Sequence, residues 1–259
     1  MQALISMNED PFIDCRDWML GEEDLVRISM RSKVFKSELP DQVEDYIEEL
    51  LLSKDDIPAQ VLAFHAEQTM PKINVAPSQG KLLNLLLRMA GAKRVLELGT
   101  LGGYSTIWMA LALPANGHVT TIDFDPNYLQ IARETFTKFG FSGMIDVRHG
   151  IAADVLKQLV AEQQQGQLDS YDFIFIDADK ENNPLYLEYC LKLSHSGTII
   201  VADNVVRDGK LITEGDKAPN IRGLRQYYQD LQSNPALDST AFQTLSAKGW
   251  DGLCITLVK

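Results

Sequence analysis

Two stretches, Tyr171–Lys180 (YDFIFIDADK) and Gly197–Asn204 (GTIIVADN), decide the fold. In each, a run of β-branched and aromatic residues ends in acidic or amide side chains. Runs with so little polar alternation are typical of central strands that are covered on both faces. If the two strands are parallel neighbours, Asp177 and Asp203 lie together at their carboxyl ends, where open α/β sheets bind ligands.

Two carboxylates, an amide oxygen and an ammonium group would meet in this crevice, from Asp177, Asp203, Asn204 and Lys180. Hard divalent cations prefer such oxygen ligands, and a neutral lysine can accept a proton. The pattern therefore indicates a cation site beside a proton acceptor. Two structural explanations stay open, because Asp203 and Asn204 both favour turns and Asp177 could simply pair with Lys180.

Alternating strand and helix patterns extend outward from these stretches and predict a doubly wound parallel sheet. We expect strands at 94–98, 119–123, 145–149, 171–176 and 198–202, and helices at 80–90, 105–113, 126–139, 154–163, 185–193 and 221–231. Leucines occupy nearly the whole circumference of the helix at 80–90, so this helix is expected to be buried. Segments 242–246 and 253–258 predict an antiparallel hairpin that closes one edge of the sheet.

Residues 1–71 have a different pattern and are predicted to form a helical extension that packs on a main domain at 72–259. Residues 41–52 carry an apolar stripe with helical spacing, and a weaker stripe runs through residues 57–70. Pro71 ends the second helix.

Composition narrows the class of protein and its partners. The 259 residues carry a formal net charge of −12 without a basic stripe, so nucleic acid is not an expected partner. Cys15, Cys190 and Cys254 are far apart and predict neither a disulfide framework nor a zinc site. With no run of 18 apolar residues and no secretory signal at the start, we expect no membrane span and a cytoplasmic protein.

A glycine-rich turn, ELGTLGGYS, follows the first strand of the series and opens a helix. Glycine lets the backbone approach a ligand closely, and the free N–H groups at a helix start suit a carboxylate. Asp123 ends the next strand, where an acid can accept hydrogen bonds from both ribose hydroxyls. The pattern predicts a nucleoside site, and the alternative is a tight turn without a ligand.

The spacing of the turn indicates which nucleoside it binds. It reads G-x-x-G-G rather than the dinucleotide pattern G-x-G-x-x-G, and Glu97 would repel a pyrophosphate. The same carboxylate suits the amino group of a methionine moiety, so S-adenosylmethionine is favoured over NAD. An NAD-linked dehydrogenase and a catalytically silent nucleoside-binding protein remain as alternatives.

Four segments together resemble the cation-dependent O-methyltransferases, the family of catechol and caffeoyl-CoA O-methyltransferases. They are VLELGTLGGYSTIWMA (95–110), TIDFDP (121–126), DFIFIDADK (172–180) and IIVADNVV (199–206), and KGWDG (248–252) resembles a bacterial small-molecule subgroup. The resemblance covers residues 72–259. It implies a Rossmann-like sheet of seven strands with an antiparallel C-terminal strand, S-adenosylmethionine as donor with S-adenosylhomocysteine as product, and magnesium or another divalent cation.

The resemblance also implies roles for single residues. Asp177, Asp203 and Asn204 stand where the family has its metal ligands, and Lys180 with Asp177 forms the catalytic group. Cofactor contacts are implied for Val75, Glu97, Gly99, Thr100, Gly103, Tyr104, Ser105, Asp123, Ala152 and Asp177. The family often has tyrosine where this chain has Asn183, so no aromatic role carries over to that position.

Together these features predict an O-methyltransferase that depends on S-adenosylmethionine and a divalent cation. The expected acceptor is a hydroxyl of a small aromatic molecule, catechol-like or hydroxycinnamoyl-like. Lys180 is expected to take the hydroxyl proton, for which it must be neutral. Because family members are often dimers, a homodimer is also expected.

Overall fold

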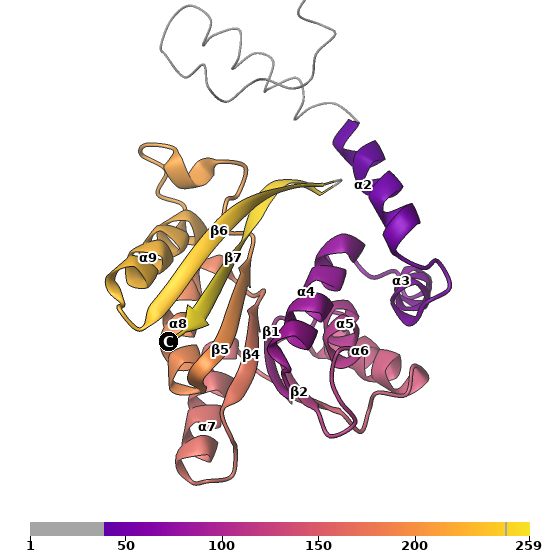
Figure 1. Cartoon of the computed structure of the whole chain (residues 1–259), viewed down its shortest axis with the longest axis horizontal. Helices are drawn as coiled ribbons and strands as arrows, with labels where there is room; N and C mark the ends of the chain where they lie inside the picture. Colours follow the sequence, from indigo (N-terminus) through magenta and orange to yellow (C-terminus); the bar gives the residue numbers. More distant parts are fainter. Residues whose placement is uncertain (1–38, 247) are drawn as a thin grey trace, which may run out of the picture. The chain divides into compact units, whose positions relative to one another are not determined.

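Seven strands form a single mixed sheet in the order β3-β2-β1-β4-β5-β7-β6 (Figure 1). The strands are β1 (Arg94–Leu98), β2 (His118–Asp123), β3 (Ile145–His149), β4 (Tyr171–Ile176), β5 (Ser194–Asp203), β6 (Leu237–Ser246) and β7 (Gly249–Val258). Strands β1 to β5 run parallel, and β7 runs antiparallel to both β5 and β6. The predicted Rossmann-like sheet with an antiparallel C-terminal strand is therefore confirmed.

This structure is a computed structural model, and it describes residues 39–246 and 248–259. Cys15 and the rest of 1–38 lie outside the described residues. The described helices are α2 (Leu39–Leu51), α3 (Ile57–Glu67), α4 (Pro77–Ala90), α5 (Tyr104–Ala110), α6 (Pro126–Lys138), α7 (Ala152–Gln164), α8 (Asn183–Lys192) and α9 (Pro219–Ser233), with short 3₁₀ turns η2 (Lys180–Asn182) and η3 (Lys210–Ile212). No helix in this part of the chain has the length and apolar character to cross a membrane.

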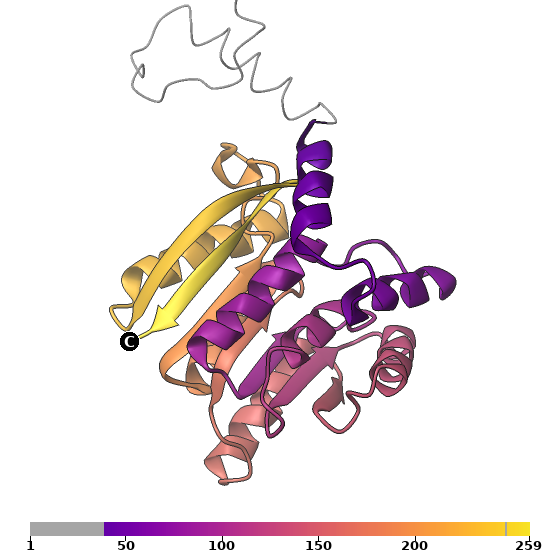
Figure 2. The same cartoon turned by 45° about the vertical axis from the view of Figure 1, so that its right-hand side comes forward.

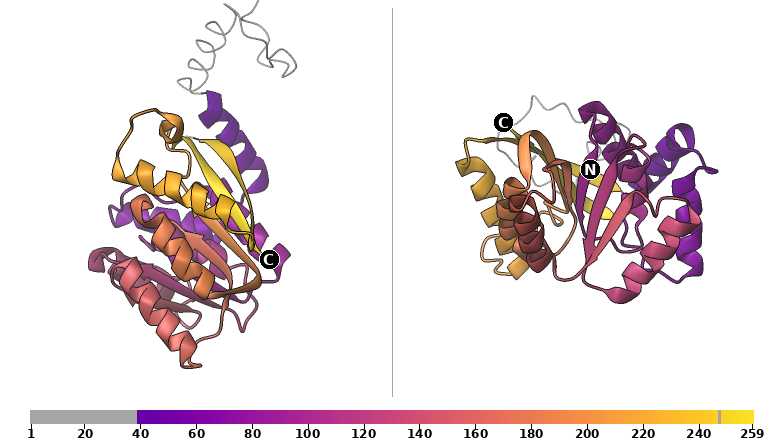
Figure 3. Two further views of the ribbon diagram at one scale, coloured as in Figure 1. Left: turned by 90° about the vertical axis from the view of Figure 1, so that its left-hand side faces the viewer. Right: turned by 90° about the horizontal axis from the view of Figure 1, so that it is seen from below.

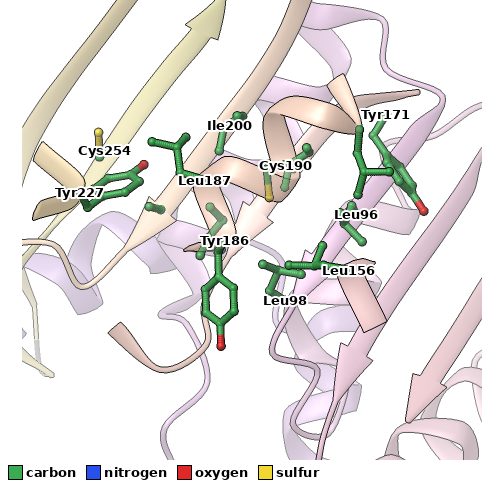
Figure 4. Close-up of a cluster of buried hydrophobic side chains, with 14 of the residues drawn as sticks. Leu96, Leu98, Leu156, Tyr171, Tyr186, Leu187, Cys190, Ile200, Tyr227 and Cys254 are labelled. Carbon is green, nitrogen blue, oxygen red and sulfur yellow. The ribbon is translucent and has the colours of Figure 1, made fainter. Parts of the chain in front are cut away.

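Helices cover both faces of the parallel strands because successive strand residues point to opposite faces. Leu96 and Leu98 of β1 pack with α7, α8 and α9, in the apolar cluster drawn in Figure 4. Val95 points the other way and packs with α3, α4, α5 and α6. The two sets of helices are visible on either side of the sheet in Figure 3.

The parallel register aligns the ends of the strands that carry the predicted site. Leu98 of β1 pairs with Ile176 of β4, and Ile176 pairs with Ala202 of β5. Chain order reverses between β1 and β4, which is the switch point where doubly wound sheets bind ligands. The residues that follow these strands therefore share one edge.

Several elements differ from the sequence-based expectation. Strand β5 begins at Ser194 instead of 198, β6 begins at Leu237 instead of 242, and β7 begins at Gly249 instead of 253. Strand β7 starts early because Gly249 pairs with Ser246, which leaves only residues 247–248 between the two strands. Pairing with a neighbouring strand therefore makes these strands longer than the sequence pattern predicted.

The expectation that the leucine-rich helix α4 is buried holds for one side of the helix only. Leu83 and Leu87 are buried, but Leu85 is 40% exposed and Met89 is 74% exposed. Figure 2 shows α4 lying over the sheet, so only one of its sides faces the sheet. A four-residue spacing places Leu85 and Met89 on one side of the helix, where no described segment covers them.

The second helix of the predicted N-terminal extension is part of the same core. Val61 of α3 is fully buried in the cluster that includes α5 and α6, and His65 Nε2 lies 3.0 Å from the Thr135 hydroxyl oxygen of α6. Burial lowers the pKa of His65. The boundary at 71/72 stays a prediction.

Candidate active site at the carboxyl edge of the sheet

A cavity of about 650 Å³ opens at the carboxyl ends of β1, β2, β4 and β5. Its walls come from residues 73–75, the glycine turn, the ends of β2 and β3, residues 177–181, and the segments after β5. This volume lies within the ~300–1,000 Å³ that is typical of small-molecule sites. The two acidic stretches and the glycine turn therefore meet in one space.

The turn after β1 and the turn after β4 touch through their backbones. The Asp177 N–H donates to Leu98 O at 2.8 Å. Gly99 has a φ of 98°, and a Cβ atom at this position would lie 2.2 Å from Asp177 O. Only glycine permits both this φ and this contact, so Gly99 fixes how closely the nucleoside end approaches the acidic end.

The acidic end holds three oxygen-bearing side chains and one ammonium group. Lys180 Nζ donates to Asp177 Oδ1 at 2.9 Å, and the Lys180 side chain is only 8% exposed. Asp203 is buried, and burial together with the negative charge of Asp177 raises the pKa of Asp203 to about 7. Asn204 lines the cavity beside them.

This set of side chains fits a hard divalent cation. Asp177 and Asp203 follow paired residues of neighbouring strands, and their mutual repulsion is the kind that a bound cation relieves. Among the described residues, no group of three Asp, Glu, His or Cys side chains forms a metal site by itself. A third oxygen would have to come from another kind of side chain, and the Asn204 amide lines the same cavity.

Packing fixes the position of Lys180. This residue begins η2, and a Cβ on Gly223 of α9 would lie 2.5 Å from Lys180 O. The absence of a side chain at Gly223 allows α9 to pack directly against the backbone of η2. The ammonium is thereby held at the cavity wall without a long flexible loop.

Asp123 organises the nucleoside end. Its Oδ2 accepts the N–H groups of Thr100 and Leu101 at 3.0 and 2.8 Å, and its Oδ1 accepts the Asp125 N–H at 3.0 Å. The carboxylate also lines the cavity, and each oxygen can accept more than one hydrogen bond. Asp123 can therefore hold the glycine turn in place and still accept ribose hydroxyls.

Large apolar side chains flank this end of the cavity. The family resemblance implied that Ile73 helps to shape the pocket, whereas Phe124 and Ile151 were not predicted from the sequence. Phe124, Ile151 and Ile73 line the cavity and are 70%, 61% and 69% exposed. Apolar side chains that line a cavity suit a flat ring system. The available signal for Phe124 and Ile151 was their position directly after Asp123 and Gly150.

Most predicted site residues line the cavity, and a few lie behind its wall. Val75, Gly99, Thr100, Tyr104, Ser105, Asp123, Ala152, Asp177, Lys180 and Asn204 line it. Gly103, Glu97 and Asp203 do not. Gly103 has a φ of 87°, and a Cβ there would lie 2.4 Å from the Phe136 ring, so its glycine is required by packing.

Glu97 lies beneath the glycine turn. Its carboxylate is fully buried and accepts hydrogen bonds from the hydroxyls of Ser105, Thr106 and Thr121. Burial raises the pKa of Glu97 to about 7, although the three hydroxyls oppose that rise. In this geometry Glu97 supports Ser105, which does line the cavity.

Asp179 and Asn183 have different environments within the D-A-D-K segment. Asp179 accepts hydrogen bonds from Asn182 and from the Tyr186 hydroxyl, so its carboxylate is already engaged. Asn183 is fully buried, and within the described residues neither atom of its amide has a hydrogen-bond partner. We find no structural role for that amide.

The fold and the cavity define a class: an α/β protein with a nucleoside-type pocket joined to an acidic, lysine-bearing pocket at the switch point of its sheet. Comparison with known proteins gives the family. The family model described as O-methyltransferase matches residues 51–253. The chain therefore belongs to the O-methyltransferase family.

Individual relatives agree with this membership. The chain is 42% identical to a catechol O-methyltransferase of Niastella koreensis, over 89% of this chain and 100% of that protein. It is 38% identical to a catechol O-methyltransferase of Mycobacterium tuberculosis, over 85% and 96% of the two chains. Among solved structures, an O-methyltransferase from Bacillus cereus in complex with SAH superposes with a TM-score of 0.81 at 40% identity, covering 86% of this chain and 99% of that one.

Proposed function

We propose that this protein transfers a methyl group from S-adenosylmethionine to a hydroxyl of a small catechol-like or hydroxycinnamoyl-like aromatic acceptor, and that the reaction depends on a divalent cation. One observation carries the proposal: the cavity runs without interruption from Asp123 and the glycine turn to Asp177, Lys180 and Asn204. A donor bound at one end would thus meet an acceptor bound at the other.

The nucleoside end would hold the donor. Asp123 would accept the ribose hydroxyls, Phe124 and Ile151 would enclose the adenine, and the N–H groups at the start of α5 would face the carboxylate. The donor supplies an electrophilic methyl group. Complexes of similar proteins with SAH and SAM support this assignment.

Asp177, Asp203 and Asn204 would hold the cation. A divalent cation bound there supplies Lewis acidity, which lowers the pKa of an acceptor hydroxyl and fixes its position. Three protein oxygens leave room for two vicinal acceptor oxygens, which is why catechol-like molecules fit best. The names of the two catechol O-methyltransferase relatives support the same acceptor class.

Lys180 would accept the hydroxyl proton. Lys180 lines the cavity, its Nζ lies 2.9 Å from Asp177 Oδ1, and its backbone is held by the packing of α9 on η2. An acceptor oxygen placed beside Asp177 would therefore lie within reach of the lysine. Holding both reactants in one cavity supplies much of the rate enhancement.

Methyl transfer from labelled S-adenosylmethionine to catechol and caffeate tests the proposal, with Mg²⁺ and with a chelator. We expect turnover with Mg²⁺ and loss of turnover on chelation, restored when Mg²⁺ is added back in excess. Turnover that is unaffected by the chelator would remove the cation from the proposal. If the protein binds SAH tightly but methylates neither acceptor, the proposed acceptor class is wrong.

We further propose that the protein is a cytoplasmic homodimer. Helix α2 has no buried residue and exposes an apolar stripe formed by Leu39, Val43, Tyr46, Ile47 and Leu50. A contiguous exposed apolar surface of this kind is typical of an interface. The two described cysteines, Cys190 and Cys254, are buried free thiols, which suits a reducing compartment.

A further inference from the structure

The loop after β5 is bound to β7 through a row of backbone donors. The four consecutive N–H groups of residues 205–208 all donate to residues 250–252 of β7. At the two ends of the row, Val205 N donates to Gly252 O and Asp208 N donates to Trp250 O, both at 3.1 Å. Backbone carbonyls therefore accept the outer two bonds.

A side chain accepts the inner two bonds. Asp251 Oδ1 accepts the N–H groups of Val206 and Arg207 at 3.0 and 2.9 Å, and also that of Gly252 at 3.0 Å. Asp251 Oδ2 lies 3.8 Å from Arg207 Nη1. One carboxylate thus connects the loop to the strand at its centre.

The loop needs such support because its backbone is in an unfavourable conformation. Asn204, Arg207 and Asp208 have φ values of 54°, 54° and 53°, a region that side-chain-bearing residues rarely adopt. Such a conformation persists only where surrounding contacts determine it. Trp250 adds a contact on Gly209, where a Cβ would lie 2.9 Å from the indole ring.

The same loop carries two residues of the cavity wall, Asn204 and Arg207, whereas Asp251 does not line the cavity. We propose that Asp251 is a positioning residue that holds this loop in the conformation presenting Asn204 to the cation and Arg207 to the acceptor. The cation part of this inference rests on the proposed function. The loop part depends only on the contacts of Asp251.

The chain offers a matched control for a test of Asp251. Asp172 also accepts two consecutive backbone N–H groups, those of Lys93 and Arg94 at 2.7 and 2.8 Å, and it pairs with His195 at 2.9 Å. It lies in the second position of β4, at the opposite edge of the sheet from Asp177. Replacing Asp172 by alanine removes the same kind of bond far from the cavity.

The experiment compares Asp251→Ala, Asp251→Asn and Asp172→Ala with the unchanged protein. Amide hydrogen exchange of residues 204–209 reports the loop, and titration with Mn²⁺ alone reports the cation site. We expect Asp251→Ala to speed exchange at Val206 and Arg207 and to raise the Kd for Mn²⁺ by ~10–100-fold, as is typical for partners of metal ligands. Asp251→Asn keeps a carbonyl oxygen, so it should rescue the Kd to within about threefold.

Unchanged loop exchange in Asp251→Ala, or a Mn²⁺ affinity no lower than that of Asp172→Ala, would overturn the proposal. If the unchanged protein does not bind Mn²⁺, the proposed cation site fails, and hydrogen exchange alone then decides the role of Asp251 in the loop. If Asp251→Ala does not fold, Asp251→Ser takes its place under the same criteria, because its single hydroxyl cannot reach both N–H groups.

Discussion

Lys180 lines the cavity, and its Nζ donates a hydrogen bond to the proposed metal ligand Asp177 at 2.9 Å. Replacing Lys180 by methionine keeps the apolar stem and removes the proton acceptor. We expect kcat to fall by ~100-fold or more, because positioned acid–base groups contribute rate factors of this size. Kinetics of methyl transfer together with calorimetric SAH binding would measure both effects.

Lys192→Met is the control for this change, because Lys192 also pairs with a carboxylate, Glu188, at 2.8 Å but lies at the surface. It should keep full activity. SAH affinity should stay within about threefold in both variants, because neither lysine nitrogen is assigned to the donor. Full turnover by Lys180→Met would exclude Lys180 as the proton acceptor.

Glu97 makes the stability of the protein depend on pH. Its pKa is raised to about 7 by burial, above the ordinary value of 4.5. Between those two values the folded protein holds a proton that the unfolded chain releases, so this group makes the free energy of unfolding fall as pH rises from about 4.5 to 7. The loss amounts to about 3 kcal/mol and is complete above pH 7.

Glu97→Gln should remove this dependence, since an amide does not titrate in this range. Urea unfolding at pH 5 and pH 8 without cofactor measures it. The free energy of unfolding of the variant minus that of the unchanged protein should be larger at pH 8 than at pH 5. A difference between the two proteins that stays constant with pH would contradict the assigned burial of the Glu97 charge.

The sequence located the residues that end strands, but it could not locate residues held by other elements. Asp177, Asp123 and Asn204 follow clear strand patterns, and the structure brings all three to the cavity. The contacts of Glu97 come from the hydroxyls of α5 and β2, and no spacing within the chain reveals them. The spacing of the glycine turn predicted Glu97 as a cofactor ligand. In the structure its carboxylate is buried beneath the turn, and its contact with the donor stays a prediction.

At the scale of elements, the contact between α4 and α5 depends on one glycine. A Cβ on Gly80 would lie 2.2 Å from the Trp108 ring. Gly80→Ala should therefore destabilise the protein by about 1–3 kcal/mol through overpacking, although alanine is the better helix former by about 1 kcal/mol. Urea unfolding measures the change.

Gly143→Ala serves as the reference for that substitution. No heavy atom lies within 4 Å of a Cβ at Gly143, and its φ lies outside the positive region. The free energy of unfolding should change there by less than about 0.5 kcal/mol. Equal stability of the Gly80 and Gly143 variants would mean that α4 and α5 pack less closely than the structure shows.

Helices and strands were predictable where the apolar residues of a segment follow one spacing, either helical or strand-like. Strands β1, β3 and β4 have the bounds that the sequence predicted. The start of β7 was not predictable, because Gly249, Trp250, Asp251 and Gly252 read as a loop and become a strand only by pairing with β6. The same pairing brings Asp251 to the loop after β5, a long-range contact without a local signature.

At the scale of the whole molecule, the described residues include exposed apolar side chains that the proposed homodimer would cover. The α2 stripe includes Leu50 at 65% exposure and Tyr46 at 64%, and α4 exposes Met89 at 74%. Large exposed apolar patches often mark protein–protein interfaces. The sequence predicted burial for α4, and a second subunit would supply it.

Leu50→Glu should weaken the proposed homodimer, because it places a charge in a desolvated interface. Sedimentation equilibrium should show the unchanged protein as a dimer and the variant shifted toward monomer by at least about tenfold in Kd. Gln42→Glu, which adds the same charge at an exposed polar position of α2, should leave the dimer intact. A monomeric unchanged protein would contradict the dimer.

The proposed function requires that Asp177, Asp203 and Asn204 together bind a divalent cation beside the donor site. Anomalous scattering from crystals grown with Mn²⁺ and S-adenosylhomocysteine tests it most directly. We expect one anomalous peak within about 2.0–2.6 Å of oxygens from all three side chains. A map with bound S-adenosylhomocysteine and no peak at these residues would contradict the proposed cation site.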